Sequence, residues 1–135
     1  MSDMTDYQKF IHLSRYARWL DTENRRETWE ETVKRYFDFF EKHLDGKPNI
    51  KKDRKLLEEA VVNMKIMPSM RSLMTAGDAL IRDNVAGYNC AYLAVNRQRA
   101  FDECLFVLMC GTGVGFSVER REVEKLPEVP DELFN

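Results

Sequence analysis

The chain has 135 residues, of which 44% are hydrophobic, and a formal net charge of -2 at pH 7. This length and composition suffice for the core of one ordinary domain and exclude a wholly disordered chain. The small net charge gives no general attraction to nucleic acid, so we expect no direct nucleic-acid partner. No apolar run reaches the roughly 20 residues that span a bilayer, and the polar start is unlike a signal peptide. We therefore expect no membrane association and a cytoplasmic location.

The residues that could bind a transition metal are few and scattered. The three cysteines are Cys90, Cys104 and Cys110, and the two histidines, His12 and His43, lie far upstream of them. No Cys-x-x-Cys pair occurs, so we predict no metal site. Thiols of a chain that is not exported stay reduced, which leaves one of these cysteines available as a working thiol with a partner outside this chain.

The first half of the sequence predicts helices. Apolar residues recur at helical spacing, and the predicted spans are Tyr7–Leu20, a second helix ending at about Leu44, and about Lys51–Lys65. Asn24 with Glu27, and Thr28 with Glu31, each have the spacing of a capping box before the second helix. In the third helix one apolar face, expected to be buried, consists of Leu56, Leu57, Ala60, Val61 and Met64.

Beyond Pro68 the pattern changes to mixed structure. Ser69–Gly77 is a short segment that includes a helical turn, and the spans that follow predict a strand at Tyr88–Val95, a helix at Ala100–Met109 and a strand at Val114–Glu119. Strand, helix and strand in this order indicate a parallel pair. Two strands leave both sheet edges unpaired, so the sheet needs further strands beside it.

Three features bear on function, and each has a plain structural alternative. Cys90 at a strand start is a buried structural cysteine or a functional one, and composition alone favours the structural interpretation. The glycines from Gly111 to Gly115 match neither a P-loop nor a dinucleotide fingerprint. They form either a tight helix-to-strand turn or a loop whose backbone a ligand approaches. Ser69, near Arg71, is a phosphate contact or, more simply, a helix N-cap.

Four stretches together carry a resemblance to a known family. They are Tyr16–Trp19 with Arg25–Val33, Met67–Arg71, Asn89–Cys90, and Gly111–Val118. In this order and spacing they resemble the N-terminal part of the catalytic subunit of ribonucleotide reductase, most closely its adenosylcobalamin-dependent (class II) branch. The resemblance covers roughly Tyr7 to Pro127.

The resemblance implies an α+β fold: N-terminal helices followed by the first strands of a ten-stranded α/β barrel, which is incomplete in this chain. The implied regions are an N-terminal helical region (1–67), the start of the barrel (68–126) and an acidic terminal loop (127–135). The implied activity is the radical- and thiol-based reduction of the ribose 2′ position of a ribonucleoside triphosphate or diphosphate. This oxidoreductase chemistry makes deoxyribonucleotides for DNA synthesis.

The family's residue roles transfer to matching positions only. Cys90 would be one of two cysteines that reduce the ribose and end as a disulfide, and Asn89 would lie beside the ribose. Ser69 would lie near the substrate phosphates, while Gly111 and Gly113 would line the pocket through their backbone. The implied cofactor is adenosylcobalamin, with most of its contacts outside this chain, and the implied reductant is a thioredoxin-like protein.

The family also needs a thiyl-radical cysteine and the disulfide partner of Cys90, and neither Cys104 nor Cys110 matches them. We therefore expect an N-terminal piece of a reductase that is inactive alone and assembles with the C-terminal remainder as a separate chain. One alternative is a non-catalytic helical interaction or regulatory module, which predicts a stable monomer without exposed sheet edges. Another is a decayed remnant without a partner.

Overall fold

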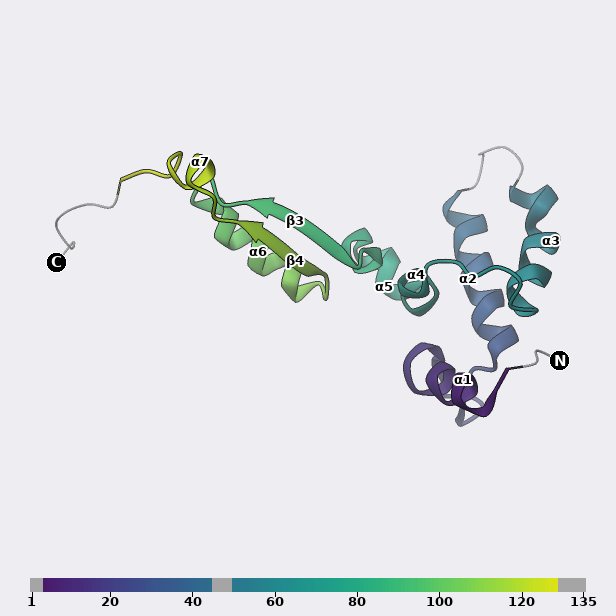
Figure 1. Cartoon of the computed structure of the whole chain (residues 1–135). Coiled ribbons are helices and arrows are strands. Elements are labelled where there is room, and N and C mark those ends of the chain that lie inside the picture. Colours follow the sequence, from purple (N-terminus) through teal and green to yellow (C-terminus); the bar gives the residue numbers. More distant parts are fainter. Residues whose placement is uncertain (1–3, 45–49, 129–135) are drawn as a thin grey trace. The chain divides into compact units, whose positions relative to one another are not determined.

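The computed structural model describes residues 4–44 and 50–128 (Figure 1). The chain divides into two compact units, Met1–Gly87 and Tyr88–Asn135. Both contain helix and strand, as expected for a mixed α and β chain. Within the described ranges, no helix is long and apolar enough to cross a membrane. The predicted regions 1–67, 68–126 and 127–135 stay a prediction, and most of the last one lies outside the described residues.

The first unit is mostly helical. Its elements are α1 (Asp6–Ile11), the π-helical turn η1 (His12–Tyr16), β1 (Trp19–Leu20), β2 (Arg25–Arg26), α2 (Trp29–His43), α3 (Ile50–Val62), α4 (Met70–Thr75), α5 (Asp78–Arg82) and the 3₁₀ turn η2 (Asn84–Gly87). β1 and β2 pair as an antiparallel hairpin. The helices α2 and α3 pack against each other (Figure 1). No element was predicted for residues 78–82, where the structure has the short helix α5.

The helix predicted over Tyr7–Leu20 is wrong at its C-terminal end. It stops after η1, and the residues beyond it form β1. The chain leaves the helix because its backbone finds partners elsewhere. The Ala17 carbonyl accepts a hydrogen bond from the Arg26 guanidinium at 2.9 Å. The Arg18 N–H donates to the Glu27 carboxylate at 3.0 Å. These tertiary bonds outweigh the helical spacing of the side chains.

One of the two predicted capping boxes starts α2. The Glu31 N–H donates to the Thr28 hydroxyl at 3.3 Å, and the Thr28 N–H donates to the Glu31 carboxylate at 2.7 Å. The box predicted at Asn24 and Glu27 is wrong. Asn24 occupies a left-handed turn with φ of 53°, and Glu27 is buried with other partners. Thr28 therefore fixes the start of the helix.

The third predicted helix ends sooner than its Lys51–Lys65 pattern indicated. α3 stops at Val62, and Met64 follows in a left-handed conformation with φ of 56°. Its apolar face is only partly buried: Val61 is 2% exposed, but Leu56 is 70% exposed. No other described element covers the side of α3 on which Leu56 lies, so the pattern overstated the burial of this face.

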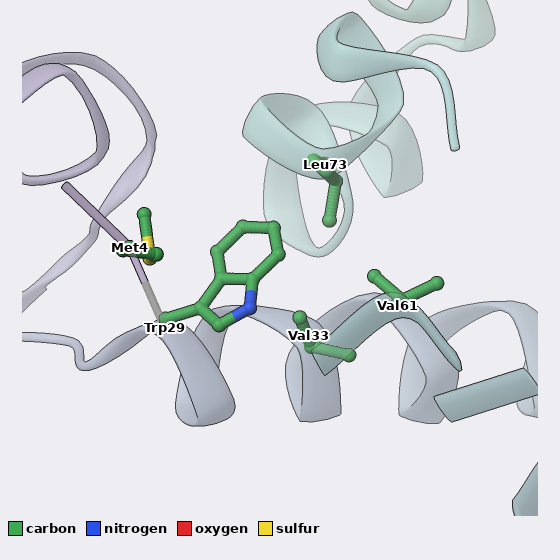
Figure 2. Close-up of a cluster of buried hydrophobic side chains, with 5 residues drawn as sticks. All are labelled: Met4, Trp29, Val33, Val61 and Leu73. Carbon is green, nitrogen blue, oxygen red and sulfur yellow. The ribbon is translucent and has the colours of Figure 1, made fainter. Parts of the chain in front are cut away.

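The core of the first unit is a small cluster around Trp29. Figure 2 shows its indole beside Met4 and facing Leu73, with Val33 and Val61 completing the group. The indole N–H is satisfied as well, because it donates to the Val62 carbonyl at 3.1 Å. The cluster joins the start of the chain, α2, the end of α3 and α4, so one aromatic ring connects four segments.

A buried carboxylate lies next to this core. Glu27 has a side chain that is 5% exposed and accepts four hydrogen bonds. They come from the Arg18 N–H at 3.0 Å, the Thr32 hydroxyl at 3.0 Å, and Arg35 at 2.8 and 3.1 Å. Burial by itself raises the pKa of Glu27, but the hydrogen bonds from Arg35 and the others outweigh it, and the pKa lies below its ordinary value of 4.5.

The guanidinium of Arg35 extends this contact to other segments. It donates to the Leu73 and Ala76 carbonyls at 3.1 and 2.7 Å, and to the Tyr16 carbonyl at 3.4 Å. The Arg18 side chain adds a bond to the Met74 carbonyl at 2.8 Å. Two arginines therefore satisfy the exposed carbonyls at the ends of η1 and α4, while one of them neutralises the buried carboxylate.

His12 is buried at the other end of the same network. Its Nε2 lies 2.9 Å from the Thr32 hydroxyl, and its ring meets Trp29 edge-on at a centroid distance of 5.5 Å. The single hydroxyl proton of Thr32 goes to Glu27, so Nε2 of His12 must carry the proton that Thr32 accepts. Burial lowers the pKa of His12 below 6.5. The charges of Glu27 and Glu30 oppose this shift, and that of Arg35 adds to it.

The second unit contains a parallel strand pair. Its elements are β3 (Cys90–Ala94), α6 (Arg99–Met109), β4 (Gly113–Ser117) and the short helix α7 (Arg120–Val123). β3 and β4 pair in parallel, with Cys90 opposite Gly113, and α6 packs on both strands (Figure 1). The predicted strand–helix–strand unit is confirmed, while α7 was not predicted. The described sheet has two strands, and a ten-stranded barrel stays a prediction.

Glu27→Gln removes the charge but keeps the shape of the side chain. It leaves the half-buried Arg35 without a counter-charge, so we expect the free energy of unfolding to fall by about 3 kcal/mol. Urea or thermal unfolding of the chain measures the loss. Glu59→Gln makes the same chemical change at an exposed site of α3 and is expected to stay within about 0.5 kcal/mol of the wild type. Equal losses for both variants would contradict the role given to Glu27.

The lowered pKa of His12 predicts an acid-sensitive fold. The unfolded chain binds the His12 proton at about pH 6.5, whereas the folded chain binds it only at lower pH. The stability contributed by neutral His12 is therefore complete above pH 6.5 and is lost as the pH falls toward the folded pKa. Unfolding midpoints measured between pH 7.5 and 5.5 are expected to fall less steeply in His12→Gln. A His12→Gln variant whose midpoint falls as steeply as that of the wild type would contradict this role of His12.

Candidate functional site

Cys90 lies at the first position of β3 with an exposed side chain and forms no disulfide. The interpretation favoured by composition, a buried structural cysteine, is therefore wrong. The burial of the strand alternates: Ala91 and Leu93 are half-buried, whereas Cys90 and Tyr92 are exposed. Because alternate side chains point to opposite faces, α6 covers the face of Ala91 and Leu93, and the thiol lies on the uncovered face.

The glycine segment is a tight turn from α6 into β4. Each N–H of its first three residues donates within the chain: Gly111 to Leu108 at 2.9 Å, Thr112 to Val107 at 3.3 Å, and Gly113 to Asn89 at 3.0 Å. The buried Thr112 hydroxyl also donates to the Tyr88 carbonyl at 3.0 Å. These bonds fix the turn beside Asn89 and Cys90. They also occupy the N–H groups that an anion would use, so an anion-binding loop gains no support here.

The two glycines singled out from the sequence have different structural reasons. Gly111 has φ of 84°, a left-handed conformation that residues with a side chain rarely adopt. A Cβ on Gly113 would meet only the Asn89 carbonyl oxygen, at 3.6 Å, which is an ordinary contact. The turn therefore needs glycine at 111. At 113 nothing within the described part of the chain requires it, and the backbone there is open to approach.

Ser69 lies in the first unit and caps a helix. Its hydroxyl accepts a hydrogen bond from the Ser72 N–H at 3.3 Å at the start of α4. The neighbouring Arg71 is half-buried and donates to the Ala86 carbonyl at 2.8 Å. The N-cap interpretation is thus confirmed. A phosphate contact from the same exposed hydroxyl stays a proposal.

The other two cysteines belong to α6 and its end. Cys104 is half-buried within the helix. Cys110 is the C-cap residue, half-buried directly before Gly111. Among the residues that the structure describes, no three His, Cys, Asp or Glu side chains gather into a group that could hold a metal ion.

One apolar cavity of about 270 Å³ lies in the first unit, between α1, α2 and α4. Methionine and aromatic side chains line it, with His12 at one wall, and none of the predicted site residues takes part. Adenosylcobalamin, a corrin with a nucleotide tail, is several times larger than this space. This cavity therefore does not hold the cofactor.

Sequence reasoning missed one residue beside the thiol. Tyr92 lies two positions after Cys90, on the same uncovered face of the sheet, directly opposite Gly115. The period of two along the strand was the signal that could have found it, because residues i and i+2 share a face.

The chain is similar to known reductases. It is 30% identical to the adenosylcobalamin-dependent ribonucleoside-triphosphate reductase of Lactobacillus delbrueckii subsp. bulgaricus, over 84% of this chain and 20% of that protein. It is 29% identical to the enzyme of the same name from Lactobacillus gasseri, over 87% of this chain and 20% of that protein. No protein-family model matches the chain.

A solved structure agrees. The crystal structure of a B12-dependent (class II) ribonucleotide reductase matches the chain with a TM-score of 0.77 and 25% identity, covering 89% of this chain and 21% of that one. The class of protein that this chain resembles is thus the ribonucleotide reductases. More narrowly, its curated homologues are the adenosylcobalamin-dependent ribonucleoside-triphosphate reductases, which confirms the resemblance inferred from the sequence. The chain spans about one fifth of their length.

Gly111→Ala and Gly113→Ala make a matched pair. We expect Gly111→Ala to destabilise the second unit by about 1–2 kcal/mol, because alanine at φ of 84° is strained. Gly113→Ala should change stability by less than about 0.5 kcal/mol, because its Cβ meets only an ordinary contact. Amide hydrogen exchange of β3 and β4 measures both. A Gly113→Ala variant as unstable as Gly111→Ala would show that the chain itself requires glycine at 113.

Proposed function

We propose that this chain is part of an adenosylcobalamin-dependent ribonucleotide reductase that converts ribonucleoside triphosphates, or diphosphates, to deoxyribonucleotides. The observation that carries the proposal is the exposed Cys90 thiol, fixed at the start of a parallel strand beside the glycine turn. It lies within the region that is similar to named reductases. The isolated chain is proposed to be inactive.

The chemistry needs two thiols. Reduction breaks the C2′–O bond of the ribose, and the hydroxyl leaves as water. A C2′–H bond forms, and two thiols supply the two electrons and become one disulfide. Cys90 provides one of these thiols, and the second comes from the part of the reductase outside this chain. A thioredoxin-like dithiol then reduces the disulfide by thiol–disulfide exchange, which prepares the site for the next turnover.

The other predicted residues position the substrate in this proposal. Asn89 lies beside the ribose, since it directly precedes Cys90 and its carbonyl holds the glycine turn. Gly111 and Gly113 form a wall through their backbone, where the missing side chain at 113 allows close approach. Ser69 contacts the phosphates with the hydroxyl that caps α4.

The proposed assembly contains the remaining barrel as a separate chain. β3 and β4 are a two-stranded sheet within the described residues, and parallel sheets are rarely stable when open on both edges. The outward side of α6 is also apolar. Phe101, Leu105, Leu108 and Met109 recur at helical spacing there and are 48–79% exposed. Both features support a chain that is covered by further barrel strands and helices.

The same features argue against a self-contained interaction module, because that alternative predicts a stable unit without exposed sheet edges. Neither the open sheet edges nor the apolar side of α6 bears on the cofactor. The relatives are named adenosylcobalamin-dependent, and we propose the same cofactor for the assembled enzyme. Most of its contacts are expected outside this chain, so no step is assigned to side chains of this chain.

Cys90→Ser tests the catalytic role. Serine cannot form the disulfide, so thiol-dependent deoxyribonucleotide formation by the assembled enzyme is expected to fall to background. The assay measures labelled deoxyribonucleotide formed in the presence of a dithiol reductant. Cys104→Ser, in the middle of α6, is the matched control and should keep turnover. Full activity of Cys90→Ser would remove this cysteine from the reaction.

Native purification tests the assembly. A tagged version of this chain, isolated from its source, should bring down a protein that carries the remaining barrel, identified by mass spectrometry of the intact partner. Substituting Leu105→Glu and Met109→Glu on the exposed side of α6 should weaken the association. Lys125→Glu, at an exposed site outside that apolar side, serves as the control for added charge. A chain that copurifies with no such partner would refute the split assembly.

A further inference from the structure

The uncovered face of the β3–β4 sheet has one large side chain. Six strand residues alternate onto the face of Cys90, namely Cys90, Tyr92, Ala94, Gly113, Gly115 and Ser117. Ser117, at the C-terminal end of β4, is buried, so the open part of the face is the part around Cys90 and Tyr92. Five of the six residues are small, and Tyr92 is the exception. Its side chain is 69% exposed and lies directly across from Gly115. The thiol of Cys90 and the phenol ring of Tyr92 thus share a face whose other residues are all small.

Packing within the chain does not require glycine at positions 113 and 115. A Cβ at Gly115 would find its nearest neighbour, the Ala91 carbonyl oxygen, at 3.9 Å, and one at Gly113 would find the Asn89 oxygen at 3.6 Å. Both are ordinary contact distances. The glycines therefore keep the surface beside Cys90 open without stabilising the sheet, and the ring of Tyr92 borders this open surface on the C-terminal side of the thiol.

The distance between Cys90 and Tyr92 is short compared with the length of a ribonucleotide. Residues i and i+2 of a strand are separated by about 7 Å. A ribonucleotide is longer than that, so one whose ribose meets the Cys90 thiol and which extends along β3 toward Ala94 also reaches the Tyr92 ring. In that orientation its base or its phosphates pack against the ring.

We propose that Tyr92 is a substrate-positioning residue of the reductase, and that its ring packs against the bound ribonucleotide next to the reacting ribose. This inference rests on the proposed function. A tyrosine ring suits the task because it is rigid, presents a flat apolar face and loses little rotamer freedom on binding. Packed against the ribose, the ring also excludes water from one side of the thiol.

The opposite face supplies a matched control. Phe116 lies one position after Gly115 in β4, so its side chain points away from Cys90, yet it is exposed to a similar degree, at 61%. An aromatic ring on this strand pair is thus present on both faces, and only the ring of Tyr92 shares the face of the thiol. Truncating one or the other separates a role at the substrate from a general role in the sheet.

The test uses the assembled reductase with CTP as the substrate and compares Tyr92→Ala, Tyr92→Leu, Tyr92→Phe and Phe116→Ala. We expect Tyr92→Ala to lower kcat/KM about 10- to 100-fold, because a ribose displaced from the thiol reacts slowly. Tyr92→Phe keeps the ring and should restore kcat/KM to within about 3-fold of the wild type. Phe116→Ala should leave kcat and KM unchanged. Thermal unfolding checks each variant, and Tyr92→Leu replaces Tyr92→Ala if the latter does not fold.

The outcomes separate this inference from the proposed function. If Cys90→Ser abolishes turnover while Tyr92→Ala and Tyr92→Leu retain wild-type kcat and KM, the positioning role is wrong and the reductase assignment stands. A Phe116→Ala variant as impaired as Tyr92→Ala also overturns it, because the effect then belongs to the sheet. If the wild-type assembly does not reduce ribonucleotides, the proposed function fails and the inference fails with it.

Discussion

The first unit depends on an ionised carboxylate held away from water. Glu27 is stable in this position only while Arg18, Thr32 and Arg35 donate to it together, because a buried charge without such donors costs several kcal/mol. Arg35 in turn binds carbonyls at the ends of η1 and α4. One carboxylate therefore sets the path of the hairpin, the position of α2 and the attachment of α4, and the cluster around Trp29 packs within that frame.

The elements that the sequence predicted well are those whose signals are local. The capping box of Thr28 and Glu31 marks the start of α2, and the parallel pair follows from two apolar strands around one helix. The failures arise where distant groups decide. Ala17 leaves the helix because Arg26 binds its carbonyl, and Leu56 is exposed because no described element covers it. Neither the hydrogen bond nor the missing layer is visible in the spacing of side chains.

The candidate site shows the same division. Residue type and position identified Cys90 and the glycine turn, but composition favoured burial of the thiol, and the structure places it on an open face. Whether a strand residue is covered depends on the side to which α6 packs, which the sequence did not specify. The resemblance to class II reductases supplied what physical reasoning could not, namely a reaction to propose, and the chain is similar to proteins that are named as such reductases.

The open edges of β3 and β4 have a consequence for handling the protein. Unpaired N–H and C=O groups at the edge of a short apolar strand form hydrogen bonds with another strand, including one from a second copy of the chain. Among the described residues both edges of this sheet are unpaired, and self-association of this kind rises with concentration. The unfolding measurements on the chain therefore belong at low protein concentration, and coexpression with the proposed partner is expected to reduce aggregation.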